Sequence, residues 1–201
     1  MEIILASASP RRADLLRQIG VVDFWVCPAE SETPLNPELP PQEGVLTIAQ
    51  DKMHSVARGV STDVLVLAAD TMVCLDGVML GKPKDETDAF VMLSRLGGAK
   101  HTVYTAVVMG YGGRESVRVC QTDVYFRNIS PEEIAAYIAT GDPLDKAGSY
   151  GLQGAAGAFI RRIDGDVYTV IGLPLYVLDE MAAELGTMIR TVDSGQLRSK
   201  A

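Results

Sequence analysis

Two spacings of hydrophobic residues alternate along this chain, and each predicts one kind of element. Apolar runs of about four to eight residues, bounded by turn residues, are typical of buried strands. Apolar residues three and four positions apart predict helices. Strands are therefore expected at 2–6, 21–27, 63–69, 72–75, 78–80, 102–110, 116–127, 159–163 and 167–171. Helices are expected at 10–19, 42–58, 85–96, 131–140 and 174–189.

The turns between these elements predict the fold class. Asp76-Gly77 is a strong hairpin signal, and Gly112-Gly113 joins two long strands. The proline-rich stretch 28–41 is expected to be a loop. Strands and helices alternate without a repeat, so we expect an α/β or mixed α+β fold with a twisted mixed sheet flanked by helices. We expect one domain over 1–190, with 130–160 as a second lobe over a cleft, and a frayed polar tail over 191–201.

The most informative segment is 7–12, where the first strand hands over to a helix. Ser9 suits the N-cap, Pro10 the first helical position, and Gly20 the position after the helix end. Unpaired backbone N–H groups and the helix dipole favour an anion at such a start. Segment 7–12 also holds two arginines, whose guanidinium groups suit phosphate oxygens. The local pattern predicts a phosphate-binding turn without a glycine-rich loop.

Composition and charge limit the ligand classes and the cellular compartment that we expect. The 201 residues carry a net charge of −8, which argues against nonspecific nucleic-acid binding but not against a nucleotide ligand. Cys27, Cys74 and Cys120 are far apart and odd in number, so we expect reduced thiols and a cytoplasmic protein. No signal peptide or membrane span is expected. His54 and His101 are expected to be surface or packed histidines rather than metal ligands.

Asp70 follows a buried strand, and ligands in α/β sheets tend to lie outside the carboxyl ends of strands. Such a carboxylate can bind a divalent cation or accept a proton from water, or it can simply turn the chain. Glu30 and Glu32 in the proline-rich loop could share a metal with it, although most acidic loop residues do not. The residues alone leave these alternatives open.

Three other polar residues could likewise have either a functional or an ordinary structural role. Lys82 lies in a short Gly-Lys-Pro loop that suits phosphate contact, but most loop lysines are only solvated. Lys52 lies on a helix whose charged face has an ordinary solvated interpretation. Gln153 lies in a glycine-rich segment, and its amide can donate and accept as base recognition requires. Together these residues predict metal-assisted chemistry on a phosphate compound.

Standard signatures of other nucleotide and hydrolase folds are missing. The sequence has no Walker A motif, no G-x-G-x-x-G and no G-x-S-x-G. P-loop NTPases, dinucleotide oxidoreductases and α/β-hydrolases of standard signature are therefore not expected.

Several blocks in order resemble the Maf family of nucleoside triphosphate pyrophosphatases. The matching blocks are LASASPRR (5–12), ETP (32–34), ADT (69–71), GKP (81–83), GDPLDKAGSYGLQG (141–154) and IGLPL (171–175). The resemblance implies a two-lobed fold around a nucleotide cleft, like that of Maf and ITPase proteins. It implies hydrolysis of a nucleoside triphosphate to the monophosphate and pyrophosphate with a divalent cation, Mg²⁺ or Mn²⁺.

The resemblance also implies roles for individual residues. Asp70 matches the proton acceptor and is expected to help hold the metal, with Glu32 as a metal ligand or water-positioning residue. The expected phosphate-binding residues are Ser7, Arg11, Arg12, Lys52 and Lys82. Water is expected to attack the α-phosphate with help from Asp70.

The family has two subgroups that differ at three positions. Members acting on 7-methyl-GTP tend to have an aromatic residue, a Gln and a Glu there, whereas dTTP/UTP members have Arg, Thr and Gln. This chain has Arg12, Thr71 and Gln153, so it resembles the dTTP/UTP subgroup. The alternatives are a pyrophosphatase for another or modified nucleotide, or a non-enzymatic nucleotide-binding regulator of septum formation. The resemblance is compatible with a homodimer. From the charge and the lack of a long apolar stretch, no nucleic-acid or membrane partner is expected.

Overall fold

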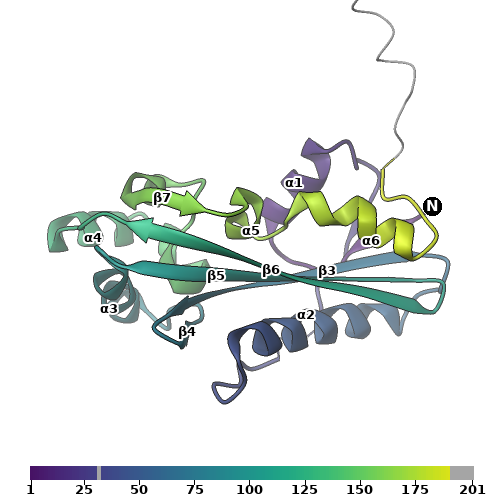
Figure 1. Cartoon of the computed structure of the whole chain (residues 1–201), viewed down its shortest axis with the longest axis horizontal. Coiled ribbons are helices and arrows are strands. Elements are labelled where there is room, and N and C mark those ends of the chain that lie inside the picture. The colour runs from purple at the N-terminus through teal and green to yellow at the C-terminus, as the bar shows by residue number, and fades with distance from the viewer. Residues whose placement is uncertain (31–32, 191–201) are drawn as a thin grey trace, which may run out of the picture.

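Three long antiparallel strands lie side by side in one mixed sheet and make up most of it (Figure 1). The computed structural model describes residues 1–30 and 33–190. Within them the strands are β1 (Ile3–Leu5), β2 (Trp25–Val26), β3 (Leu65–Leu75), β4 (Val78–Leu80), β5 (Lys100–Tyr111), β6 (Arg114–Phe126) and β7 (Ile160–Asp164). Their order is β2-β1-β3-β5-β6-β7, with β4 also on β3. β1 pairs in parallel with β2 and β3, and the other pairs are antiparallel. The predicted mixed sheet is confirmed.

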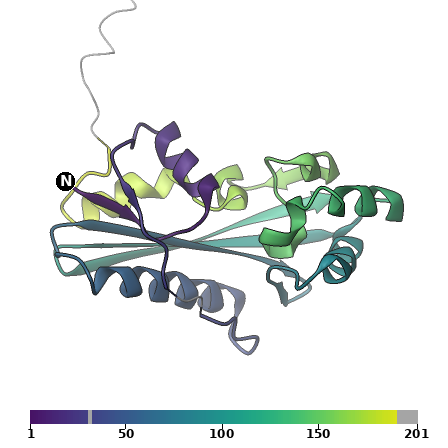
Figure 2. The same ribbon diagram turned by 180° about the vertical axis from the view of Figure 1, so that it is seen from behind.

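Helices cover both faces of this sheet. They are α1 (Pro10–Gln18), α2 (Pro41–Ala57), α3 (Glu86–Leu96), α4 (Pro131–Ile138), α5 (Val167–Ile171) and α6 (Leu178–Glu184). α1 and α6 share a core cluster on one face, and α2 forms another on the opposite face. α3 and α4 build a third cluster around the other end of the long strands. Figure 2 shows α1 and the green segment 141–159 on the same side of the sheet.

One edge of β3 has a gap that matters for the site. β5 pairs along the other edge from Val66 to Cys74. On this edge β1 pairs with Leu65–Leu67 and β4 with Val73–Leu75. Between them, residues 68–72 pair with no strand of the described chain on this edge. The middle of a buried strand is thereby open from the side.

The strand β3 corrects a sequence prediction. Asp70 was expected just beyond the end of a strand, but it lies in the middle of β3. Asp70 and Thr71 pair with Ala106 and Thr105 of β5, so their backbone continues the ladder. Their polar side chains have polar partners: Lys52 Nζ lies 2.6 Å from Asp70 Oδ1, and Arg12 Nη2 donates to Thr71 Oγ1 at 3.1 Å. The strand then continues into the Asp76-Gly77 turn, where both residues have positive φ as a tight hairpin needs.

Two C-terminal predictions were also wrong. Segment 167–171 was expected to be a strand, but it is the helix α5, because the Asp166 carboxylate caps it by accepting from Thr169 N at 2.7 Å. The expected helix 174–189 is instead a 3₁₀ turn, Leu175–Val177, followed by α6. Gly186 at φ 78° ends it in the left-handed region.

The first half of the chain follows the prediction more closely. α2 covers the expected range, although it begins at Pro41, which was expected in the loop; proline suits the first helical position. β2 is much shorter than the expected 21–27. The division into a 1–190 domain and a tail stays a prediction, and the tail 191–201 lies outside the described residues.

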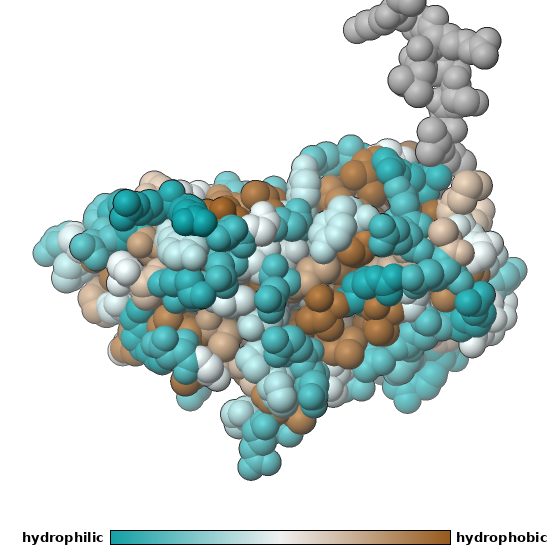
Figure 3. Space-filling model, in the orientation of Figure 1, coloured by the Kyte–Doolittle hydropathy of each residue, from teal (hydrophilic) through white to brown (hydrophobic). Residues whose placement is uncertain are grey.

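The mostly hydrophilic surface and the free cysteines agree with what the composition predicts. In Figure 3 hydrophilic side chains cover much of the visible face and surround smaller hydrophobic patches. Among the described helices, none has both the length and the apolar character that a membrane crossing requires. Cys27, Cys74 and Cys120 are free thiols, the last two buried.

Candidate active site

A cleft of about 670 Å³ lies at the open edge of β3. The turn after β1, the N-terminus of α1, helix α2, strand β3 and the loops around 81–82, 145–153 and 170–171 line it. The predicted site residues that line it are Ser7, Arg11, Arg12, Lys52, Asp70, Thr71, Lys82 and Gln153. Glu32, the other predicted metal ligand, lies outside the described residues. Glu30 is exposed and is not among the residues that line the cleft.

The turn from β1 to α1 is held by Ser7. Its buried Oγ accepts from Ser9 N at 3.2 Å and from Arg12 Nη1 at 2.9 Å. Ser9 is the N-cap as predicted, with extended backbone, and Pro10 is the first helical residue. The Ser9 side chain makes no capping bond, so Ser7 rather than Ser9 organises this turn. The start of α1 is thereby fixed against the cleft.

Arg12 ties three parts of the chain together. Besides Ser7, it donates from Nε to the Gly172 carbonyl at 2.8 Å and from Nη2 to Thr71 Oγ1 at 3.1 Å. Thr71 Oγ1 lies 3.0 Å from Thr105 Oγ1, which continues the chain of contacts into the core. Only 8% of Arg12 is exposed. These three contacts make Arg12 part of the cleft wall.

Position 172, whose carbonyl accepts the hydrogen bond from Arg12, requires glycine. Its φ of +117° is strained for any residue with a side chain, and an added Cβ would lie 3.0 Å from Thr71 Oγ1. The turn after α5 can therefore approach Arg12 and Thr71 only with glycine.

Asp70 and Thr71 point to opposite faces of the sheet, because successive strand residues alternate. Lys52 of α2 lies on the Asp70 side, with Nζ 2.6 Å from Asp70 Oδ1. Both side chains are mostly buried, 13% and 15% exposed. Thr71 meets Arg12 on the α1 side. The cleft reaches both faces because β3 has the gap at 68–72, which no reading of the sequence alone revealed.

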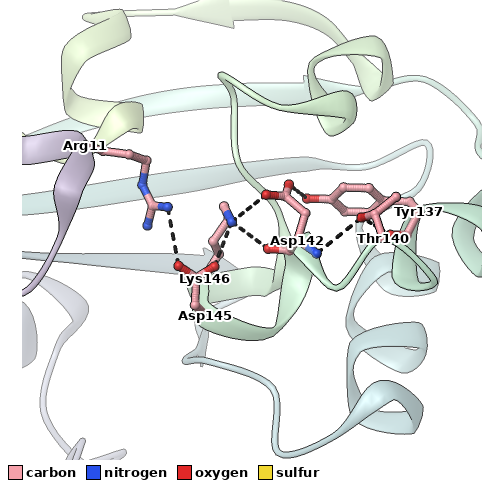
Figure 4. Close-up of polar contacts among 6 residues, drawn as sticks. All are labelled: Arg11, Tyr137, Thr140, Asp142, Asp145 and Lys146. Atoms are coloured by element: carbon pink, nitrogen blue, oxygen red, sulfur yellow. Dashed lines mark hydrogen bonds and ion pairs between the residues drawn. The ribbon is translucent and has the colours of Figure 1, made fainter. Parts of the chain in front are cut away.

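The wall opposite α1 holds a compact polar network that sequence reasoning gave no role. Lys146 Nζ donates to the Asp142 carbonyl at 2.5 Å, to Asp142 Oδ1 at 2.8 Å and to Asp145 Oδ1 at 2.7 Å. Tyr137 of α4 donates from its hydroxyl to Asp142 Oδ2 at 2.8 Å. Arg11 Nη1 reaches Asp145 Oδ2 at 3.5 Å, which joins the two walls (Figure 4).

These contacts determine the charge states in this wall. Burial opposes ionisation of Asp142 and Asp145, but the hydrogen bonds from Lys146 outweigh it and lower the pKa of both carboxyls. Burial and the bond to Asp142 raise the pKa of Tyr137. The wall therefore contains two carboxylates, an ammonium and a neutral phenol. The sequence signal was the Asp-Pro-Leu-Asp-Lys run, whose spacing alone does not distinguish a solvated turn from a cleft wall.

The two histidines behave as predicted. His54 is exposed beside Glu115, with Nε2 2.6 Å from its carboxylate. His101 is packed in an aromatic cluster with Phe126 and Tyr150, and its Nε2 lies 2.8 Å from the Tyr150 hydroxyl. Burial lowers the pKa of His101 to about 4. Tyr150 itself lines the cleft, so His101 lies directly behind its floor.

The chain is similar to known proteins over nearly its whole length. The family model for Maf-like proteins matches residues 2–185. The dTTP/UTP pyrophosphatase of Moorella thermoacetica is 45% identical over 187 residues, which cover 92% of this chain and 95% of that protein. The dTTP/UTP pyrophosphatase of Syntrophomonas wolfei is 46% identical over 187 residues, 92% of this chain and 98% of that protein.

A weaker likeness involves a solved structure. The Staphylococcus aureus Ham1 protein has a TM-score of 0.45 and 15% identity, over 79% of this chain and 91% of that chain.

Proposed function

Because this chain belongs to the family of Maf-like proteins, we propose that it is a nucleoside triphosphate pyrophosphatase acting on dTTP and UTP. The products would be the nucleoside monophosphate and pyrophosphate. Full-length relatives named dTTP/UTP pyrophosphatase, at about 45% identity, support this substrate class. The chain spans nearly the whole length of these relatives.

One observation carries the proposal. Asp70 lines the cleft and is held by Lys52 of α2 at the open edge of β3. The start of α1, Ser7, Arg11 and Lys82 line the same cleft. A carboxylate that shares a cleft with a helix start and several cations suits an anionic substrate that must be attacked by water. The volume of about 670 Å³ is in the range of small-molecule sites.

The donor set fits a divalent cation of the Mg²⁺ type. Mg²⁺ is usually bound through one or two carboxylates together with substrate phosphates, rather than by a cage of protein ligands. The described residues contain no group of three or more His, Cys, Asp or Glu that could hold a metal. Asp70 would hold the ion jointly with the nucleotide. The ion, Mg²⁺ or Mn²⁺, would offset phosphate charge and polarise the α-phosphate.

In the proposed reaction Asp70 accepts a proton from the attacking water. The water oxygen forms a bond to the α-phosphorus, and the bond from that phosphorus to the β-phosphate oxygen breaks. Pyrophosphate leaves with the electron pair, and Ser7, Arg11, Lys52 and Lys82 stabilise its charge by hydrogen bonds and ion pairs. Lys52 also keeps the Asp70 carboxylate in place.

Base selection is assigned to Arg12, Thr71 and Gln153. Arg12 and Thr71 are hydrogen-bonded to each other and to the surrounding wall, so they shape the cleft on the α1 side of β3. Gln153 is exposed on the opposite wall and has the amide that base recognition requires. These roles follow the subgroup pattern of the family.

The decisive experiment measures pyrophosphate release from a panel of triphosphates by the purified protein with Mg²⁺. We expect the highest kcat/KM with dTTP and UTP, and loss of activity after chelation. No release from any triphosphate would favour a nucleotide-binding regulator. Preference for a different or modified base would leave the reaction type intact and overturn the substrate assignment.

A further inference from the structure

Gln153 sits in a turn that rests on side chains from elsewhere in the fold. The turn runs from Gly151 to Gly154, with Gly154 N donating to the Gly151 carbonyl at 3.2 Å. A Cβ added at Gly151 would lie 2.7 Å from Lys146 Cε and 2.9 Å from Cδ. A Cβ added at Gly154 would lie 2.8 Å from Asp142 Oδ2. The two glycines on either side of Leu152 and Gln153 thus pack directly on Lys146 and Asp142.

Tyr137 supports the same turn through Asp142. Its hydroxyl donates to Asp142 Oδ2 at 2.8 Å, and this is the oxygen that would lie 2.8 Å from a Cβ added at Gly154. The residue is buried in α4, and its ring packs edge-on against Phe159 with centroids 5.5 Å apart. α4 itself begins with a capping box between Ser130 and Glu133. The turn is therefore anchored to a well-formed helix.

The Lys146 ammonium donates its hydrogen bonds to oxygens of the protein rather than to a substrate. An ammonium has three N–H donors, and three oxygens of Asp142 and Asp145 lie within 2.5 to 2.8 Å of Nζ. The residue is only 9% exposed. Although Lys146 lines the cleft, its donors are already used by this wall, which distinguishes it from a phosphate-binding lysine.

We propose that Tyr137, Asp142 and Lys146 are positioning residues that hold the Gly151–Gly154 turn and thereby set nucleotide selectivity through Gln153. The inference rests on the proposed function, because Gln153 must recognise the base. None of the three residues touches the reacting phosphate in this scheme. Their loss should loosen the turn, weaken binding of the preferred base and leave the chemical step nearly intact.

Tyr137→Phe is the sharpest test, because it removes the hydroxyl and keeps the ring. Loss of one buried hydrogen-bonding group predicts a decrease of about tenfold in kcat/KM for dTTP, mainly through KM. The ratio of kcat/KM between dTTP and dGTP should shrink by a similar factor. Tyr125→Phe, on β6 and outside the cleft, is the matched control and should leave both quantities unchanged. Asp142→Asn, which keeps the shape, should repeat the Tyr137→Phe pattern.

Hydrogen exchange separates this inference from the proposed function, because it needs no activity. Exchange of the peptide covering 147–157 should become about tenfold faster in Tyr137→Phe, while the α6 peptide stays unchanged. Unchanged exchange in 147–157 would overturn the positioning role. Faster exchange with an unchanged dTTP to dGTP ratio would overturn the selectivity role. An inactive wild-type protein would overturn the proposed function and the selectivity role with it, while exchange would still decide whether the network holds the turn.

Discussion

Lys52 Nζ lies 2.6 Å from Asp70 Oδ1, and this pair joins helix α2 to the open edge of strand β3. Both side chains are mostly buried, so the attraction between them is less screened than in a surface ion pair. The pair fixes the one carboxylate that the proposed chemistry uses as a base. It also brings a cation to the place where phosphate would bind.

Replacing Asp70 by Asn should remove the base without changing the shape of the site. We expect kcat to fall by about 10²-fold or more, as is typical for loss of a general base. Steady-state pyrophosphate release from dTTP measures this. Asp14→Asn, at an exposed carboxylate that pairs with Arg17 and does not line the cleft, serves as the control. Near-normal turnover in Asp70→Asn would end the assignment of Asp70 as proton acceptor.

Replacing Lys52 by Met should also reduce turnover, because the carboxylate loses its partner and the phosphate loses a cation. Loss of one preorganised donor typically costs about 10²-fold in kcat. The same assay, with a thermal melt to show that the variant is folded, measures it. Lys84→Met, at an exposed lysine before α3, should retain full activity. A folded Lys52→Met variant with wild-type kcat would contradict the role of the pair.

Gln153→Glu should change substrate preference more than stability. A carboxylate offers only acceptors where the amide offers both donor and acceptor, so a base recognised through both kinds of contact is lost. We expect kcat/KM for dTTP and UTP to fall by about 10²-fold while the melting temperature changes little. Gln121→Glu, exposed on β6, makes the same chemical change away from the cleft. An unchanged nucleotide profile in Gln153→Glu would remove Gln153 from base recognition.

Arg12→Lys should act on both stability and selectivity. An ammonium cannot reproduce the fork that reaches Ser7, Thr71 and the Gly172 carbonyl together. We expect a loss of about 1–3 kcal/mol in the free energy of unfolding, measured by urea denaturation, and a weaker preference for dTTP. Arg58→Lys, exposed after α2, should have no effect on either. Full stability of Arg12→Lys would show that the wall does not depend on the guanidinium.

His101 should make the fold sensitive to mild acid. Burial lowers its pKa to about 4 from an ordinary value of 6.5, so between these values the unfolded chain binds more protons than the folded one. The free energy of unfolding should therefore fall as pH decreases from 6.5 to 4, by about 3 kcal/mol in total, and be unaffected by this group above pH 6.5.

Urea denaturation between pH 7 and 4 checks the role of His101. His101→Phe should be less stable at pH 7, because the Tyr150 hydroxyl loses its partner, but should lack this part of the pH dependence. His54→Gln, at the exposed histidine, should keep the His101 component. The same slope in wild type and His101→Phe would show that other groups cause the acid sensitivity.

Local sequence signals predicted much of the framework. Ser9 and Pro10 marked the start of α1, and Asp76-Gly77 marked the hairpin, because capping and tight turns depend on a few neighbouring residues. The same signals failed at 167–171, where an apolar run of β-branched residues favoured a strand. There the Asp166 cap is a local helix signal that the β-branched run outweighed in the prediction. The hydrogen bond from Thr105 to the Thr169 carbonyl also holds this segment, and no local pattern contains such a contact.

The amino-acid sequence alone determined the chemistry that this protein can offer: a helix start with serine and arginines, a carboxylate after a buried run, and a glycine-rich segment with an amide. Only the tertiary structure decided that β1 and β4 leave the middle of β3 open, so that Asp70 and Thr71 serve the two sides of one cleft. It also decided that Lys146 is bound by Asp142 and Asp145. Strand pairing and burial join residues far apart in the chain, and no local pattern specifies which edge stays unpaired.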